Sequence, residues 1–210
     1  MSGLPPYDLD EPLLAATRAD GLPRLALRTV LAPAVVLGRS SVAEKEVHLE
    51  ACATAGVPVL RRRGGGCAVL LDPGNLVLSL ALPVPGFGSI GALWRGITGW
   101  LIEGLAAVGL PELRQDGISD LVLGDRKVGG ASMVRSQGLA YYATTLLVTP
   151  DVALMEQVLA HPPREPAYRR GRPHRAFVGR LGPDLAGVAD LRARLEASLR
   201  PPSPGSASWC

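Results

Sequence analysis

Apolar residues recur along this chain with two periods, which together predict a mixture of strands and helices. Short runs that alternate or are continuously apolar predict strands at 24–30, 34–37, 57–60, 68–71, 76–82, 118–123, 127–135 and 139–148. Longer amphipathic segments predict helices at 8–20, 41–54, 90–108, 150–160 and 184–199. The helix at 41–54 is expected to begin with a capping box, because Glu44 follows Ser41 at the required spacing.

The length and composition of the chain favour one domain with an aliphatic core. At 210 residues the chain is long enough to bury a substantial core, and no linker marks a second domain. Because aromatic residues make up only 4% of the chain, Leu, Val and Ala must fill that core. We expect the domain to span residues 1–200 and the Pro/Ser/Gly-rich segment 201–210 to be a disordered tail.

Charge and cysteine content exclude several classes of protein. The formal charge is only +3 and the excess is local, which argues against a general nucleic-acid binder. The three cysteines fit no metal-ligand spacing, so no metal site is expected and a reducing compartment is favoured. Residues 1–20 lack a signal-peptide pattern, and no apolar run reaches the ~18 residues of a membrane span. The expectation is a cytoplasmic protein without nucleic-acid or membrane partners.

The most distinctive stretch is Arg61-Arg62-Arg63-Gly64-Gly65-Gly66, which lies between two predicted strands. Arginine offers forked, permanently charged donors that suit phosphate and carboxylate. Glycine lets the backbone turn sharply and bring its N–H groups close to a ligand. The stretch therefore predicts an anion-binding loop, although a glycine-rich hairpin with a solvated basic flank has the same composition.

Two motifs together resemble the lipoate-protein ligase and octanoyltransferase family. The family's first motif reads roughly R-R-x-S/T-G-G-G-A-V-x-H-D-x-G-N, and residues 61–75 read RRRGGGCAVLLDPGN. Its second motif reads roughly N-D-L…G-x-K-[VI]-x-G-[ST]-A, and here SDL at 119–121 is followed by GDRKVGGAS at 124–132. Two motifs in the right order are far more specific than either motif alone.

The resemblance implies both a fold and a reaction. The fold would be α+β, with mixed, mostly antiparallel sheets packed with helices, as in the class II biotin and lipoyl ligase catalytic domains. The reaction would use ATP and Mg²⁺ to activate lipoate or octanoate as an acyl adenylate. The acyl group would then pass to a lysine of a lipoyl carrier domain, of the 2-oxoacid dehydrogenase E2 or glycine cleavage H protein type.

The same resemblance assigns roles to individual residues. Lys127 and Asp120 would be catalytic, with Lys127 at the α-phosphate and acyl carboxylate and Asp120 orienting the adenylate or helping to receive a proton. The strand at 76–82 and neighbouring side chains would line a tunnel for the acyl chain. The residues expected to bind the nucleotide and acyl group are Arg62, Arg63, Gly65, Gly66, Cys67, Ala68, Val69, Leu70, Asp72, Asn75 and Gly130.

Departures from the family pattern keep two other functions open. Cys67 stands at a glycine position, Leu71 replaces the usual histidine, and Ala143 begins ATTLL where ligases often have HGTLL. One alternative is an ATP-independent octanoyl or lipoyl transferase between carrier proteins, which in the family uses a cysteine thioester. The region 114–119 lacks that cysteine, and Cys67 is expected to be a small buried residue whose side chain points away. The other alternative is a non-catalytic accessory protein that binds lipoyl domains.

Two partners are expected from the same considerations. The family's ligases commonly carry a C-terminal accessory domain that this chain lacks, so a separate accessory subunit would be one partner. The basic segment 161–180 is expected to be either a solvated loop or a binding loop. As a binding loop, it would dock an acidic carrier domain through Arg169, Arg170 and Arg172, or close over a nucleotide phosphate.

Overall fold

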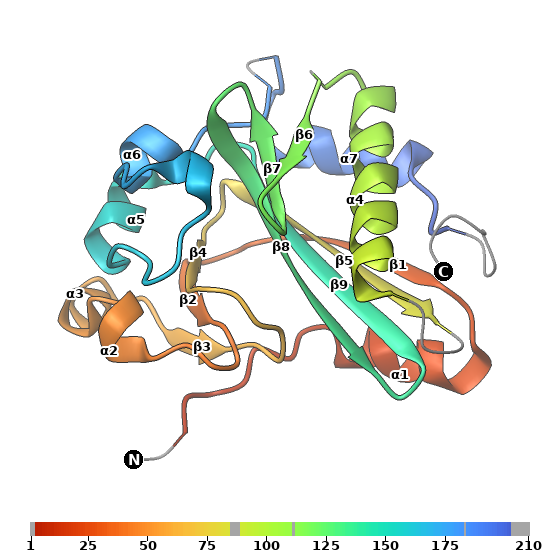
Figure 1. Ribbon diagram of the computed structural model, residues 1–210, viewed down its shortest axis with the longest axis horizontal. Helices are drawn as coiled ribbons and strands as arrows, with labels where there is room; N and C mark the ends of the chain where they lie inside the picture. The colour runs from red at the N-terminus through yellow and green to blue at the C-terminus, as the bar shows by residue number, and fades with distance from the viewer. Residues whose placement is uncertain (1–2, 85–88, 111, 183, 203–210) are drawn as a thin grey trace.

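A six-stranded antiparallel sheet forms the centre of the structure, a computed structural model that describes residues 3–84, 89–110, 112–182 and 184–202 (Figure 1). Every neighbouring pair of strands in this sheet is antiparallel. In spatial order the strands are β1 (Arg24–Thr29), β5 (Asn75–Pro83), β9 (Leu139–Leu147), β8 (Arg126–Ser136), β7 (Asp120–Leu123) and β6 (Arg114–Asp116). The predicted hairpin around Gly124 is confirmed as β7–β8. Strand β6, which is short and polar, was not predicted from the sequence.

One face of the large sheet is covered by two long helices. These are α4 (Ile90–Ala107) and α7 (Val188–Ser198), which lie beside each other in Figure 1. The leucines of β5 pack against them: Leu76, Leu78 and Leu80 are fully buried. Burying each such side chain contributes about 1.5–3 kcal/mol, so this layer supplies most of the aliphatic core that the composition requires.

A second, three-stranded sheet lies on the other side. Its central strand β2 (Ala34–Leu37) runs parallel to β3 (Val59–Arg61) and antiparallel to β4 (Val69–Leu71). Strands β3 and β4 therefore flank β2 and do not pair with each other. The Arg-Gly stretch between them is a crossover between the two edges of this sheet, and the hairpin interpretation is wrong.

Short helices cover the second sheet, and one of them corrects a sequence prediction. The segment predicted as one helix at 41–54 forms α2 (Ala43–Glu46) and α3 (Leu49–Thr54). Between them Val47 forms a β-bridge with Leu159, and the His48 N–H donates to the Val158 carbonyl at 2.9 Å. This pairing with a distant segment replaces the helical hydrogen bonds. The expected capping box is also wrong, because α2 has no side-chain cap at its N-terminus.

The remaining helices are short or lie at the ends of the chain. Helix α1 (Glu11–Asp20) packs near β1 and β5. Helices α5 (Val152–Val158) and α6 (His174–Phe177) contribute Met155, Val158 and Phe177 to the cluster under the second sheet. Residues 203–210 of the expected tail lie outside the described residues. No described helix is both long and apolar enough to cross a membrane. A 3₁₀ helix, η1, spans Ala167–Arg169.

The turn at 72–75 joins the two sheets through a buried hydrogen-bonded network. Asp72 accepts hydrogen bonds from the Gly74 N–H at 2.7 Å and from Asn75 Nδ2 at 3.1 Å. The Gly74 carbonyl in turn accepts from the N–H groups of Val148 and Thr149. These contacts hold the start of β5 against the end of β9.

We predict that Gly74→Ala destabilises the protein by about 2 kcal/mol or more, because its Cβ would lie 1.9 Å from the Thr149 carbonyl oxygen and force a backbone shift. Gly99→Ala is the matched control: this helix glycine has nothing within 4 Å of its added Cβ. That substitution should stabilise the protein by about 0.5–1 kcal/mol. Urea unfolding of both variants measures the difference, and equal stabilities would contradict this account of the turn.

Candidate active site

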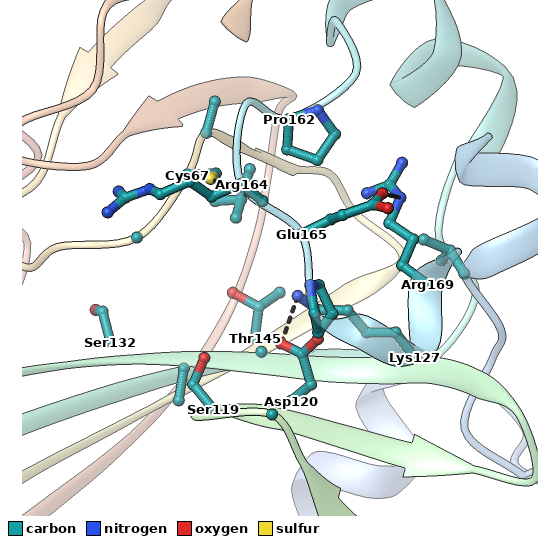
Figure 2. A pocket seen from close by; sticks show the side chains of 18 of the residues that line it. Cys67, Ser119, Asp120, Lys127, Ser132, Thr145, Pro162, Arg164, Glu165 and Arg169 are labelled. Carbon is teal, nitrogen blue, oxygen red and sulfur yellow. Dashed lines mark hydrogen bonds and ion pairs between the residues drawn. The ribbon is translucent and has the colours of Figure 1, made fainter. Parts of the chain in front are cut away.

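A cavity of about 520 Å³ lies where the two sheets and the 161–180 segment meet (Figure 2). Its volume is in the range of small-molecule sites. Apolar side chains such as Leu70, Leu147 and Phe177 line it together with a few polar groups. The predicted site residues that line it are Gly65, Gly66, Cys67, Ala68, Val69, Leu70, Asp120, Lys127 and Gly130. The two motifs, far apart in the sequence, thus face one cavity.

Lys127 and Asp120 form an ion pair in this cavity. Lys127 Nζ lies 2.8 Å from Asp120 Oδ1, and the two side chains are 27% and 10% exposed. The other carboxylate oxygen of Asp120 accepts a hydrogen bond from the Tyr168 hydroxyl at 2.9 Å. Burial and the Asp120 charge raise the pKa of Tyr168 above its usual range, so this hydroxyl stays protonated as a donor. Asp120 is therefore held on both sides and fixes the position of the Lys127 amine.

A register shift between β7 and β8 aims Lys127 into the cavity. Asp120 pairs with Gly130 and Leu121 with Gly129, but Val122 pairs with Lys127, so Val128 is an extra residue on β8. Val128 belongs to the core. Lys127 and Gly130 consequently both face the cavity. A Cβ on Gly130 would lie 2.9 Å from Lys127 Cε and Nζ, which explains a glycine at this position.

Arg62 lies behind the glycine loop and holds its shape. Its guanidinium donates to the Val36 carbonyl at 2.8 Å, to the Gly65 carbonyl at 2.7 Å and to the Cys67 carbonyl at 2.9 Å. It does not line the cavity. Burial lowers the pKa of this arginine from its ordinary value. Arg62 therefore has a structural role: it fixes the path of the glycine loop from outside the cavity.

The carbonyl groups of four consecutive loop residues, 64–67, all accept hydrogen bonds. The Gly64 carbonyl accepts from the Arg39 N–H at 2.8 Å, and the Gly66 carbonyl accepts from Ser41 Oγ at 3.1 Å, while Arg62 binds the other two. Because C=O and N–H point in opposite directions in a trans peptide unit, the N–H of Gly65 is turned away from Arg39, that of Gly66 away from Arg62 and that of Cys67 away from Ser41. Such successive N–H groups are suited to bind anionic oxygens.

Two residues that sequence reasoning did not select complete this wall. The buried carboxylate of Glu46 accepts from Ser41 Oγ at 3.0 Å and from the Ala68 N–H at 2.6 Å. Gly38 approaches the loop so closely that a Cβ there would lie 1.9 Å from the Gly66 carbonyl oxygen. In the sequence, Ser41 was interpreted as forming a capping box with Glu44, and Glu46 was assigned no role.

Several residues expected at the site lie elsewhere. Arg63 forms an ion pair with Glu11 at 2.7 Å, and its side chain is 57% exposed. Asp72 and Asn75 form the turn described above and do not line the cavity. The strand at 76–82 does not line the cavity either, because its leucines face α4 and α7. The strand that was expected to form the acyl tunnel is therefore not part of this cavity, whose apolar lining comes mainly from α4, β4, β8, β9, α5 and α6.

The basic segment 161–180 folds over the cavity instead of remaining a solvated loop. Arg169 is only 4% exposed, and its guanidinium lies over the Phe177 ring at 4.7 Å. Arg172 binds the Asp125 carboxylate at 2.8 Å and the Asp125 carbonyl at 2.9 Å. Arg169 is therefore buried and Arg172 is half-buried, and of the three arginines expected to dock a carrier domain only Arg170 is fully exposed.

His174, at the start of α6, is buried in a positive environment. Burial, and then the nearby Arg169 guanidinium, lower the pKa of His174 to about 4. At neutral pH the imidazole is therefore uncharged, and its Nδ1, which lies 3.8 Å from Glu156 Oε1, makes no true ion pair. His174 can line the cavity without adding a charge.

Cys67 faces the cavity, contrary to the expectation that its side chain points away. Its Sγ lies 3.6 Å from the Arg164 carbonyl oxygen and is only partly buried (Figure 2). The thiol therefore lies in the cavity that also holds Lys127.

The fold and the two loops define a known class of protein. The model of the lipoyl protein ligase A/B catalytic domain matches residues 3–199. The chain belongs to this family, and the expectation of an α+β fold with a mostly antiparallel sheet is confirmed.

Individual relatives agree with this assignment. A lipoate–protein ligase of Streptococcus pyogenes is 31% identical over 156 residues, which are 73% of this chain and 44% of that protein. The structure of a lipoate-protein ligase A bound with ATP has a TM-score of 0.71 and 22% identity, covering 95% of this chain and 83% of the other. A bipartite lipoate protein ligase of Thermoplasma acidophilum, studied with its E2 lipoyl domain, has a TM-score of 0.69 and 23% identity, with coverage of 92% and 80%. The chain spans about half the length of the curated relatives it matches.

The low pKa of His174 predicts a loss of stability in acid. An unfolded histidine titrates near 6.5 and the folded one near 4, so the unfolded state binds more protons between these values. Stability should be complete above pH 6.5 and should fall as the pH is lowered, by about 2 kcal/mol at pH 4.5 from this group. His174→Gln should remove that part of the decline, whereas His48→Gln, at an exposed position, should retain it. Urea unfolding at pH 7 and pH 4.5 tests this, and an unchanged decline in His174→Gln would refute it.

Proposed function

We propose that this protein attaches a lipoyl or octanoyl group to a lysine of a lipoyl carrier domain, through an acyl adenylate made from ATP. The observation that carries the proposal is the Lys127–Asp120 pair, which faces the glycine loop across an apolar cavity. The family membership and the relatives named as lipoate ligases support the same reaction. The relative bound with ATP supports use of that nucleotide.

In the first step, a carboxylate oxygen of lipoate would attack the α-phosphorus of ATP and expel pyrophosphate. The ammonium of Lys127 would sit between the two anions and stabilise the charge that develops on the phosphoryl oxygens. The N–H groups of residues 65–67 would bind oxygens of the nucleotide or acyl group. Among the described residues no group of three His, Cys, Asp or Glu side chains could hold a metal, so Mg²⁺ would arrive on the phosphates of the nucleotide.

In the second step, the amine of a carrier lysine would attack the acyl carbonyl, forming an amide and releasing AMP. Lys127 would stabilise the departing phosphate oxygen. Asp120 would keep Lys127 in place and help to receive the proton of the attacking amine. The apolar lining would bind the eight-carbon chain at about 0.8 kcal/mol per buried methylene.

Two partners follow from this proposal. The acceptor would be a lipoyl domain of the E2 or H-protein type, guided by exposed arginines such as Arg170 and Arg180. A separate accessory subunit would be the second partner. The bipartite ligase of Thermoplasma acidophilum, and a relative there named subunit 1, provide the precedent.

The test is the mass of a purified lipoyl carrier domain after incubation with the protein, lipoate and Mg²⁺, with ATP present or omitted. We expect an ATP-dependent gain of one lipoyl group, reduced about 100-fold or more in Lys127→Ala. Lys45→Ala removes the other lysine of the chain and should retain full activity. The assay is run with and without a candidate accessory subunit. Acylation that does not need ATP, or that survives in Lys127→Ala, would contradict the proposal.

A second candidate function rests on the position of Cys67. A thiol that faces the cavity could accept an octanoyl group from one carrier as a thioester and release it to the lysine of another, without ATP. In that case octanoyl transfer from an octanoyl carrier would proceed without nucleotide and would fall at least about 100-fold in Cys67→Ser. If Cys67 only fills space beside Arg164, the serine variant should retain its activity with ATP and show none from the octanoyl carrier.

A further inference from the structure

The segment 161–180 contains a cationic donor without a partner. Among the described residues, the buried side-chain nitrogen and oxygen atoms that lack a hydrogen-bond partner are Thr17 Oγ1, Thr98 Oγ1 and Arg169 Nη2. Of these, only Arg169 belongs to a residue that lines the cavity. A buried charged donor without a partner is costly, so this atom calls for an acceptor.

The neighbouring arginines show that the fold could have satisfied this group. Arg172, which also stacks on Phe177, donates from all three of its nitrogens to Asp125, Tyr168, Arg169 and Ala176. Arg62 likewise donates from all three nitrogens to backbone carbonyls. Arg169 instead donates from Nε to the Arg172 carbonyl at 3.0 Å, with Glu165 Oε2 at 3.5 Å from the same nitrogen.

The surroundings of Arg169 fix its guanidinium beside the ligand space. The Phe177 ring lies under it at 4.7 Å, and Nε donates to the Arg172 carbonyl at 3.0 Å. Glu165 is already engaged by the Gly171 N–H at 2.9 Å and by His161 at 2.9 Å. Figure 2 shows Arg169 and Glu165 on the side of the cavity that the 161–180 segment contributes, with Lys127 and Asp120 on another wall.

We propose that Arg169, which lines the cavity, is a phosphate-binding residue of this site: a small turn of its guanidinium on the Phe177 ring would bring Nη2, which protein atoms cover in the unliganded chain, to a phosphate oxygen of the bound nucleotide, from a different wall than Lys127. The inference rests on the proposed use of ATP. A phosphate oxygen would supply the acceptor that the fold withholds, and a planar guanidinium suits it geometrically. The acyl substrate, whose chain occupies the apolar lining, would not depend on this contact.

The experiment is calorimetric titration of the full chain with MgATP and, separately, with lipoate. Arg169→Gln and Arg169→Lys are compared with Arg175→Gln, a matched control in the same segment whose side chain is 74% exposed. We expect the Kd for MgATP to rise about 10- to 100-fold in Arg169→Gln and by a smaller factor in Arg169→Lys, which keeps the charge but not the planar fork. The control should stay within about twofold, and lipoate binding should be unchanged throughout.

The outcomes separate this inference from the proposed function. If either Arg169 variant remains folded in a thermal unfolding scan and binds MgATP as tightly as the unaltered protein does, Arg169 is a structural residue and the inference fails alone. If lipoate binding falls together with ATP binding, the substitution has disturbed the whole cavity and the assignment to phosphate is wrong. If the unaltered protein binds no MgATP, the inference and the ATP-dependent function fail together.

Discussion

The candidate site depends on the hydrogen bonds that the half-buried guanidinium of Arg62 donates. A buried charge is costly unless hydrogen bonds replace those of water. Here carbonyls of Val36, Gly65 and Cys67 do so, and one residue thereby ties the glycine loop to the central strand of the second sheet. Ser41 and Arg39 bind the remaining carbonyls of the same loop. With these carbonyls bonded, the path of the loop and the directions of its N–H groups are fixed as well.

The facing wall depends on strand register. The extra residue at Val128 brings Lys127 and Gly130 to the same face of the large sheet, where Asp120 from the neighbouring strand can reach the amine. Neither wall is a site without the other, because the loop offers neutral donors and the strand pair offers a positioned charge. The Lys127–Asp120 wall is built on paired strands, and the glycine loop is anchored between two strands of the second sheet; rigid elements of this kind position side chains more accurately than free loops do.

The sequence by itself predicted a glycine-rich loop between two strands and the hairpin that carries Lys127. The choice of Lys127 and Asp120 as a pair came from the family resemblance, and the structure brings the two side chains within 2.8 Å. The direction of Arg62, by contrast, is decided by Val36 and by the loop's own path. The break at Val47 is decided by residues 158–160, which pair with it and override its helical pattern. Similarly, the continuous apolar run of β5 correctly indicated a buried strand, but could not indicate which layer its leucines face.

The arginine-rich composition of the segment 161–180 did not indicate which arginines stabilise the fold and which face the cavity. Arg169 and Arg172 are close in sequence and stack on the same phenylalanine, yet one has a full set of acceptors and the other does not. The difference arises because Asp125, at the β7–β8 turn, lies within reach of only one of them. The basic segment therefore contains one arginine, Arg172, whose donors are satisfied within the fold, and another, Arg169, with a donor that lacks an acceptor. The two arginines are distinguished only by the hydrogen-bond partners of each donor atom. In this segment the unpaired donor belongs to Arg169, which lines the cavity.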